Sequence, residues 1–160
     1  MVMLAEGILK RHWNQSVPVD VARIAQGMGV ALDYSDSLSV CAHLQVSLQN
    51  QPRLTLCQQH SLALQRYATA QALGHVALHH LRPGLERHIV VTEDFVVDEN
   101  SRTEREAHQF ALRLLMPEAV LRYCVQEMAL QDLLELADIF DVPATLMGWR
   151  LLHWPAPSSA

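Results

Sequence analysis

Apolar residues recur at helical spacing along most of the chain and alternate with polar residues only in parts of its first two thirds. Four apolar residues from Val21 to Met28 fall at i, i+3, i+4 and i+7, which predicts an amphipathic helix that ends at Gly29. A further helix is expected to begin at Thr103 as its N-cap. The same spacing predicts helices over residues 4–13, 58–81, 103–116, 118–128, 131–140 and 144–152.

Short alternating stretches predict strands over residues 30–34, 39–48 and 53–57, with a turn at 50–52. Two more short β-rich pieces are expected within residues 87–97. The first third of the chain therefore predicts two helices followed by a small β-meander. The fold class expected for the whole chain is α+β and mostly helical.

Length and composition favour one globular domain. The chain has 160 residues, of which 50% are hydrophobic and 18% are charged, so it can bury a core. We expect a single domain over residues 1–152, with a helical C-terminal subregion at about 118–152 and a flexible Pro/Ser-rich tail at 153–160. No apolar run approaches the length of a membrane span and no signal peptide is evident, so a soluble, cytoplasmic protein is predicted.

Charge and cysteine content narrow the function classes. The formal net charge of −5 argues against a broad nucleic-acid-binding surface. The helix-turn-helix-like segment 131–152 has Arg150 as the one basic residue of its second helix, so we expect a protein-docking surface and not direct nucleic-acid binding. Three cysteines without a C-x-x-C pair indicate reduced thiols and no zinc knuckle.

Nine histidines invite a search for a metal site. The general zincin motif is H-E-x-x-H, in which two histidines one helical turn apart bind zinc and the glutamate activates the bound water. The segment Gln71-Ala72-Leu73-Gly74-His75 lies within the longest predicted helix and keeps the second histidine. Gln71 stands at the first ligand position and Ala72 at the general-base position, so the segment by itself does not define a metal motif.

The sequence around this segment resembles the active-site helix of the ImmA/IrrE family of bacterial and phage metallo-endopeptidases. Residues 65–79 read Q-R-Y-A-T-A-Q-A-L-G-H-V-A-L-H, where the family typically reads Q-R-F-T-x-A-H-E-L-G-H-x-L-L-H. Residues 104–117 resemble the family block E-x-x-A-N-x-F-A-x-x-L-L-M-P, and residues 133–152 resemble its C-terminal ending. The resemblance runs in order from about residue 17 to 152 and implies a small zincin-like domain.

The resemblance implies a zinc peptidase that cleaves a partner transcriptional repressor. Carried over by position, the ligands are Gln71, His75 and Glu104, and the base is Ala72. An amide is a poor zinc ligand, and loss of a positioned base costs about 10²–10⁴-fold in rate. We therefore predict no catalytic residue and no ordinary zincin catalysis.

Two interpretations of His108 remain open. The family usually has Asn or Asp at this position, one helical turn after Glu104. In one interpretation His108 completes a rearranged metal site with His75 and Glu104. In the other it packs near the vacated site as a hydrogen-bonded neutral imidazole. A pairing of His75 with His79 is a second rearrangement, and Glu106 competes with Glu104 as the retained acid.

Other polar residues near the altered motif also have two interpretations. Arg66 and Tyr67, with Gln71, are candidates to line a substrate groove, or they simply follow the Arg–aromatic pair of the family. The adjacent histidines 79 and 80, with His88 nearby, are further metal ligands or solvated residues at a helix end.

Taken together, these residues predict a binding module descended from a peptidase. Its partner would be a helix-turn-helix repressor or an antitoxin-type protein, encoded in a prophage, mobile element or toxin–antitoxin module, with no membrane involved. No cofactor is expected. The alternatives are a weak or atypical endopeptidase that uses zinc in a rearranged site, and a purely structural subunit.

Overall fold

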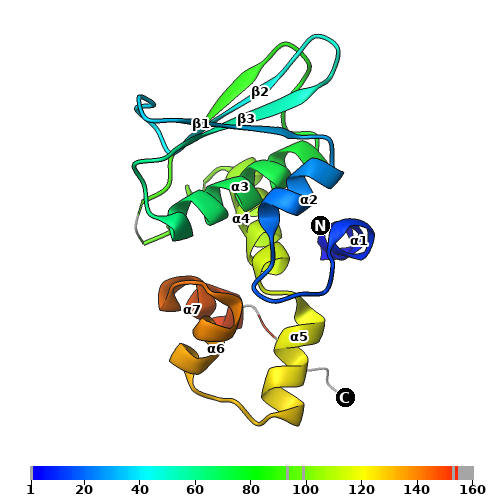
Figure 1. Cartoon of the computed structure of the whole chain (residues 1–160), viewed down its shortest axis with the longest axis vertical. Helices are drawn as coiled ribbons and strands as arrows, with labels where there is room; N and C mark the ends of the chain where they lie inside the picture. Colours follow the sequence, from blue (N-terminus) through cyan, green and yellow to red (C-terminus); the bar gives the residue numbers. More distant parts are fainter. Residues whose placement is uncertain (1, 93, 99, 153, 155–160) are drawn as a thin grey trace.

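The fold is α+β and mostly helical, as predicted. A computed structural model of the chain describes residues 2–92, 94–98, 100–152 and 154 (Figure 1). In chain order the elements are α1 (Val2–His12), α2 (Val21–Gly27), β1 (Ala31–Ser35), β2 (Ala42–Val46), β3 (Pro52–Cys57), α3 (Leu62–Ala77), β4 (Glu86–Ile89), α4 (Arg102–Leu115), α5 (Glu118–Arg122), the π-helical turn η1 (Tyr123–Glu127), α6 (Leu133–Phe140) and α7 (Ala144–Leu152).

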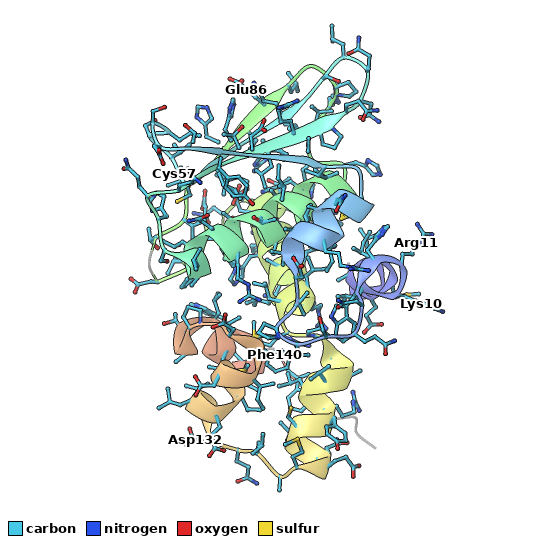
Figure 2. All side chains as sticks on the ribbon, viewed as in Figure 1. Lys10, Arg11, Cys57, Glu86, Asp132 and Phe140 are labelled. Carbon is cyan, nitrogen blue, oxygen red and sulfur yellow. The ribbon has the colours of Figure 1, made fainter. Side chains whose placement is uncertain are left out.

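The sheet lies on one side of α3, and the labelled helices all lie on that same side of the sheet (Figure 1). Leu44, Leu54 and Leu56 of the central strands are buried against this helical layer. α4 packs along α3, while α5, α6 and α7 form a separate helical layer beyond the end of α4. Glu86 projects from the sheet face that is turned away from the helices (Figure 2).

The strand order is β1-β3-β2-β4, so the predicted meander is wrong. β1 and β3 are parallel, and β2 is antiparallel to both β3 and β4. Alternation fixes the face to which each side chain points, but it does not fix the neighbouring strand. Leu54 and Leu56 of β3 are buried, whereas Ala31 and Tyr34 of β1 are exposed, so β3 lies inside the sheet and β1 forms an edge.

The long helix α3 was predicted at the right place but too long at both ends. The Ser61 hydroxyl accepts a hydrogen bond from the Leu64 N–H, which caps the helix four residues later than expected from the spacing. At the other end, His79 has a φ of 57°, a left-handed conformation that a helix cannot continue. The helix therefore spans Leu62–Ala77 and not residues 58–81.

Two further local predictions need correction. The N-cap of α4 is Ser101 and not Thr103, because the Ser101 hydroxyl accepts the Glu104 N–H. Within residues 87–97, the described part forms one strand, β4, where two were predicted. Phe95 has a φ of 55°, which interrupts the extended backbone there. Apart from Trp154, the predicted flexible tail lies outside the described residues.

Candidate functional site

A close approach of α3 to α4 builds the site. A Cβ atom added to Gly74 would lie 3.1 Å from the Phe110 Cβ and 3.2 Å from the Ala107 Cα, so glycine lets the two helices come together here. His75 follows Gly74 directly in α3, and α4 carries Glu104 in its first turn. The packing therefore places the altered motif beside the glutamate of the later block.

The Glu104 carboxylate is the centre of one polar network. The Gln71 Nε2 donates to Glu104 Oε2 at 2.9 Å, and the Arg87 Nη2 donates to Glu104 Oε1 at 2.6 Å. Arg87 comes from β4 and also donates to the Thr103 hydroxyl at 2.9 Å. The side chains of Arg87 and Glu104 are 24% and 25% exposed, so this ion pair is largely shielded from water. The negative charge of Glu104 is thus compensated by the Arg87 guanidinium.

A second network begins at His75 and runs to Glu106. The Nδ1 atoms of His75 and His80 are 2.9 Å apart, and the His80 Nε2 lies 3.2 Å from Glu106 Oε2. Glu106 can only accept, so His80 Nε2 carries a proton, and a neutral His80 then accepts at Nδ1 from the His75 Nδ1–H. This tautomer leaves the His75 Nε2 as an acceptor, 3.7 Å from Glu104 Oε1 and without a hydrogen-bond partner.

Burial sets the protonation state of His75. Its side chain is fully buried, and desolvation, with smaller contributions from the charge of Arg87 and from His80 when it is protonated, lowers its pKa from 6.5 to about 3. His75 is therefore neutral at pH 7. Burial also raises the pKa of the Tyr67 hydroxyl, and the Glu104 charge adds to that rise, so Tyr67 stays protonated.

The structure brings Gln71, His75 and Glu104 together and places His108 beside Tyr67. The His108 Nδ1 is hydrogen-bonded to the Tyr67 hydroxyl. The rings of Tyr67 and Trp149 also pack against the His108 ring in T-shaped pairs. The rearranged metal site with His75, Glu104 and His108 stays a prediction.

The three residues predicted to line a groove have different surroundings. Tyr67 is fully buried and Gln71 is 1% exposed, so in this conformation neither offers surface to a ligand. Arg66 donates to the carbonyl oxygens of Val19 and Phe140, which ties α3 to the N-terminal segment and to α6. A role for these residues in a groove stays a prediction.

Sequence reasoning missed the part that Arg87 plays in the site. Its signal was available, since Ile89 is an apolar residue of the same strand and residues i and i+2 share a face. Ile89 is buried, so Arg87 points inward as well. The sequence predicts that His80 is a solvated residue or a metal ligand. In the structure its side chain is 8% exposed and is hydrogen-bonded to His75 and Glu106.

The residues beside Glu104 do not fit a catalytic zinc ion. Peptidase zinc sites have three protein ligands, typically two histidines and a carboxylate, and a base for the bound water. Here the set is one imidazole, one amide and a carboxylate that already binds Arg87. Ala72, at the base position, is fully buried and carries no proton acceptor in its side chain.

The domain consists of a small mixed sheet over a helix that carries His75, with a second helix that carries Glu104. The family model of the IrrE N-terminal-like domain (peptidase M78) matches residues 15–152, so the chain belongs to this family. The predicted family assignment is thereby confirmed. A search of curated proteins finds no match. No helix in the described part of the chain is long and apolar enough to cross a membrane.

Proposed function

We propose that this protein is a non-catalytic member of its family that binds a helix-turn-helix repressor or antitoxin-type partner without cleaving it. The observation that carries the proposal is the ion pair between Arg87 and Glu104. In an active relative the carboxylate at this position would bind the metal ion. Here the Arg87 guanidinium supplies the positive charge instead.

The ion pair works against metal binding in two ways. The guanidinium occupies Glu104 Oε1 at 2.6 Å, so a metal ion would have to displace it or share the oxygen with it. A displaced Arg87 would lose a charge-assisted hydrogen bond in a partly buried position, and a divalent ion beside it would meet a like charge. The Gln71 amide holds the other carboxylate oxygen.

The base position adds an independent argument against peptide hydrolysis. Ala72 cannot accept a proton from water, and the loss of a positioned base lowers a rate by about 10²–10⁴-fold. The domain otherwise keeps the family fold over residues 15–152. A retained fold without the reactive groups is what a binding-only descendant requires. The net charge of −5 favours a protein partner over nucleic acid.

One observation favours the alternative, a weak or atypical zinc endopeptidase. The His75 Nε2 and the Gln71 Oε1 are buried and have no hydrogen-bond partner among the described residues. A histidine that binds a metal typically donates its other ring N–H to a neighbour, and His75 Nδ1 does so to His80. This candidate requires Arg87 to leave Glu104.

Mixing experiments with the partner distinguish the two candidates. The tag-free full chain is mixed in turn with the purified helix-turn-helix repressors and antitoxins of the genome that encodes it, in the presence of zinc, and each complex is measured by size-exclusion chromatography and calorimetry. Intact-mass spectrometry then follows the partner over several hours. We expect a stable complex in which the mass of the partner does not change, with or without a chelator.

Two outcomes would contradict the proposal. Cleavage that stops on chelation or in a His75→Ala variant would show that the protein is a metallopeptidase. Absence of a complex with every one of these helix-turn-helix proteins would show that the protein does not have the proposed binding role.

A further inference from the structure

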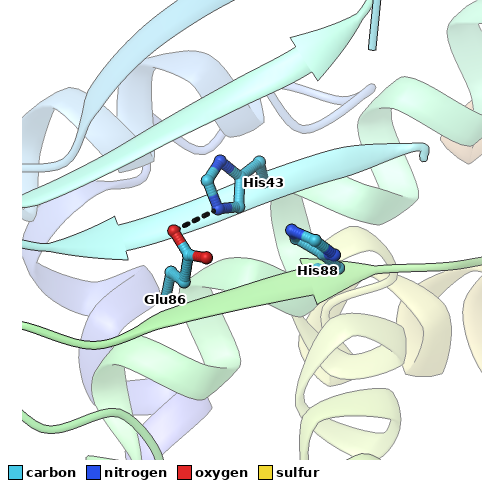
Figure 3. A group of neighbouring side chains, drawn as sticks. All are labelled: His43, Glu86 and His88. Atoms are coloured by element: carbon cyan, nitrogen blue, oxygen red, sulfur yellow. Dashed lines mark hydrogen bonds and ion pairs between the residues drawn. The ribbon is translucent and has the colours of Figure 1, made fainter. Parts of the chain in front are cut away.

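The outer face of the sheet carries a compact group of three ligand-type side chains. His43 lies on β2, and Glu86 and His88 lie on β4, the neighbouring edge strand (Figure 3). His43 and His88 are directly opposite each other in the antiparallel pair, and Glu86 precedes His88 by two residues, so all three point to the same face. Among the described residues, this is the one group of at least three His, Cys, Asp or Glu side chains within reach of a single ion.

The distances suit a small metal ion. The His43 Nε2 lies 3.1 Å from Glu86 Oε2, and the ligand atoms of the three residues all lie within 4.8 Å of one another. Metal–ligand bonds of about 2.0–2.1 Å in a tetrahedral site place the ligand atoms about 3.3 Å apart. The His43–Glu86 distance, at present that of a hydrogen bond, is close to this value. His88 is exposed, so a rotation of its side chain can shorten the remaining distances.

The donor set indicates the class of metal. Two imidazoles and one carboxylate suit zinc and the neighbouring transition metals, whereas magnesium and calcium prefer sites made entirely of oxygen ligands. Three protein ligands leave the fourth position of a tetrahedral ion open to water or to another ligand. None of the three members of this group is a cysteine, which disfavours copper(I).

The surroundings of this group do not oppose a cation. Gln45 and Thr55, the strand partners of Glu86 and His43, are uncharged. Arg53 is paired with Asp33, so its charge is compensated. Arg87, between Glu86 and His88 in sequence, points to the inner face and binds Glu104. The sheet therefore separates this group from the network around His75.

We propose that His43, Glu86 and His88 form a surface binding site for zinc or a similar divalent transition metal. The two strands fix the backbone positions of all three ligands before the metal binds, because His43 and His88 are paired across the sheet. The site is independent of the altered peptidase motif and does not rest on the proposed function.

Calorimetric titration of the tag-free full chain with zinc chloride at pH 7.5 tests this site. We expect one zinc ion per chain. The dissociation constant should be at least tenfold larger in His88→Gln and in Glu86→Gln than in the unchanged protein. His60→Gln is the matched control, since it removes a histidine outside this group, and it should leave the affinity unchanged. His75→Gln should also leave it unchanged. Circular dichroism checks that each variant folds.

Three results would overturn the proposal: no zinc binding by the unchanged protein, equal binding in His88→Gln and Glu86→Gln, or loss of binding in His75→Gln. The last result would place the ion at the altered motif instead. The site also affects how metal content is interpreted, since zinc in the purified protein would not by itself indicate a working peptidase centre.

Discussion

At the scale of single residues, Gln71 and His75 take part in a network of polar contacts with His80 and Glu104. A histidine must be neutral to bind zinc, and burial keeps His75 neutral, although no zinc is needed to explain its position. Its Nδ1 is bonded to His80, and its Nε2 faces Glu104 at 3.7 Å. A buried neutral imidazole has a consequence that can be measured in the pH dependence of stability.

The pH prediction follows from the lowered pKa of His75. Its pKa is about 3 in the folded chain and about 6.5 when unfolded, so between these values the unfolded state binds one more proton. The stabilisation is complete above pH 6.5 and is lost progressively as the pH falls toward 3. The contribution of His75 to the slope of the unfolding free energy against pH approaches about 1.4 kcal/mol per pH unit within that window.

Urea denaturation at a series of pH values measures this slope. We expect His75→Gln to have a shallower slope between pH 6 and 4 than the unchanged protein, whatever its absolute stability. His60→Gln is the comparison for loss of a histidine elsewhere. A slope in His75→Gln as steep as in the unchanged protein would mean that His75 does not stay neutral in the fold.

At the scale of elements, the crossing of α3 and α4 positions the site. Gly74 is the contact point, because the atoms opposite it include the Ala107 backbone and the fully buried Phe110. A backbone atom cannot yield as the tip of a long side chain can. The glycine of the family motif therefore has a packing role here that does not depend on catalysis.

Gly74→Ala is expected to destabilise the protein by up to about 2 kcal/mol, the balance of two opposing effects. Alanine gains up to about 1 kcal/mol in helix propensity, but the added methyl group overpacks the crossing at a cost of about 1–3 kcal/mol. Gly148→Ala in α7 is the matched control, since a Cβ there meets nothing within 4 Å, and it should stabilise by about 0.5–1 kcal/mol. Thermal and urea denaturation measure both. Stabilisation by Gly74→Ala would show that the two helices can move apart freely.

At the scale of the whole molecule, Arg150 connects the C-terminal helices to the rest of the fold. It lies on α7 and is 1% exposed, and its Nε donates to the carbonyl oxygen of Met116 at 3.1 Å. Its Nη2 is 3.7 Å from Glu118 Oε2. Burial, with repulsion from Arg113, lowers the pKa of Arg150 to about 10, so the side chain remains charged at pH 7. The buried Arg150 thus attaches α7 to the end of α4 and the start of α5 through polar contacts.

Arg150→Ala should lower the free energy of unfolding by about 2–4 kcal/mol, because it leaves a cavity and an unpaired Met116 carbonyl. Arg122→Ala is the control. Arg122 pairs with the same Glu118, but its side chain is 52% exposed, so a loss of at most about 1 kcal/mol is expected. Urea denaturation followed by circular dichroism measures both variants. Equal losses would mean that Arg150 does not hold the two parts together.

Local patterns in the sequence are enough to predict the family, the fold class and most of the elements. Helical spacing located α2, α3 and α4, because an amphipathic helix must repeat its apolar face every three to four residues wherever it packs. Local spacing could not determine the ends of α3, which depend on the Ser61 cap and on the left-handed conformation of His79. Nor could it determine the neighbours of β3, since strands far apart in sequence can pair equally well.

The surroundings of Gln71 and His75, by contrast, depend on tertiary packing. His75 and Glu104 could be expected to meet, because the family blocks name them, whereas the Arg87–Glu104 pair joins a short edge strand to a helix that begins thirteen residues after the strand ends. The outer-face group of His43, Glu86 and His88 arises in the same way, from the register of β2 against β4. Both depend on which strands pair and in which register. Burial of one face of the whole sheet sets this pairing, and no local pattern is sufficient to predict it.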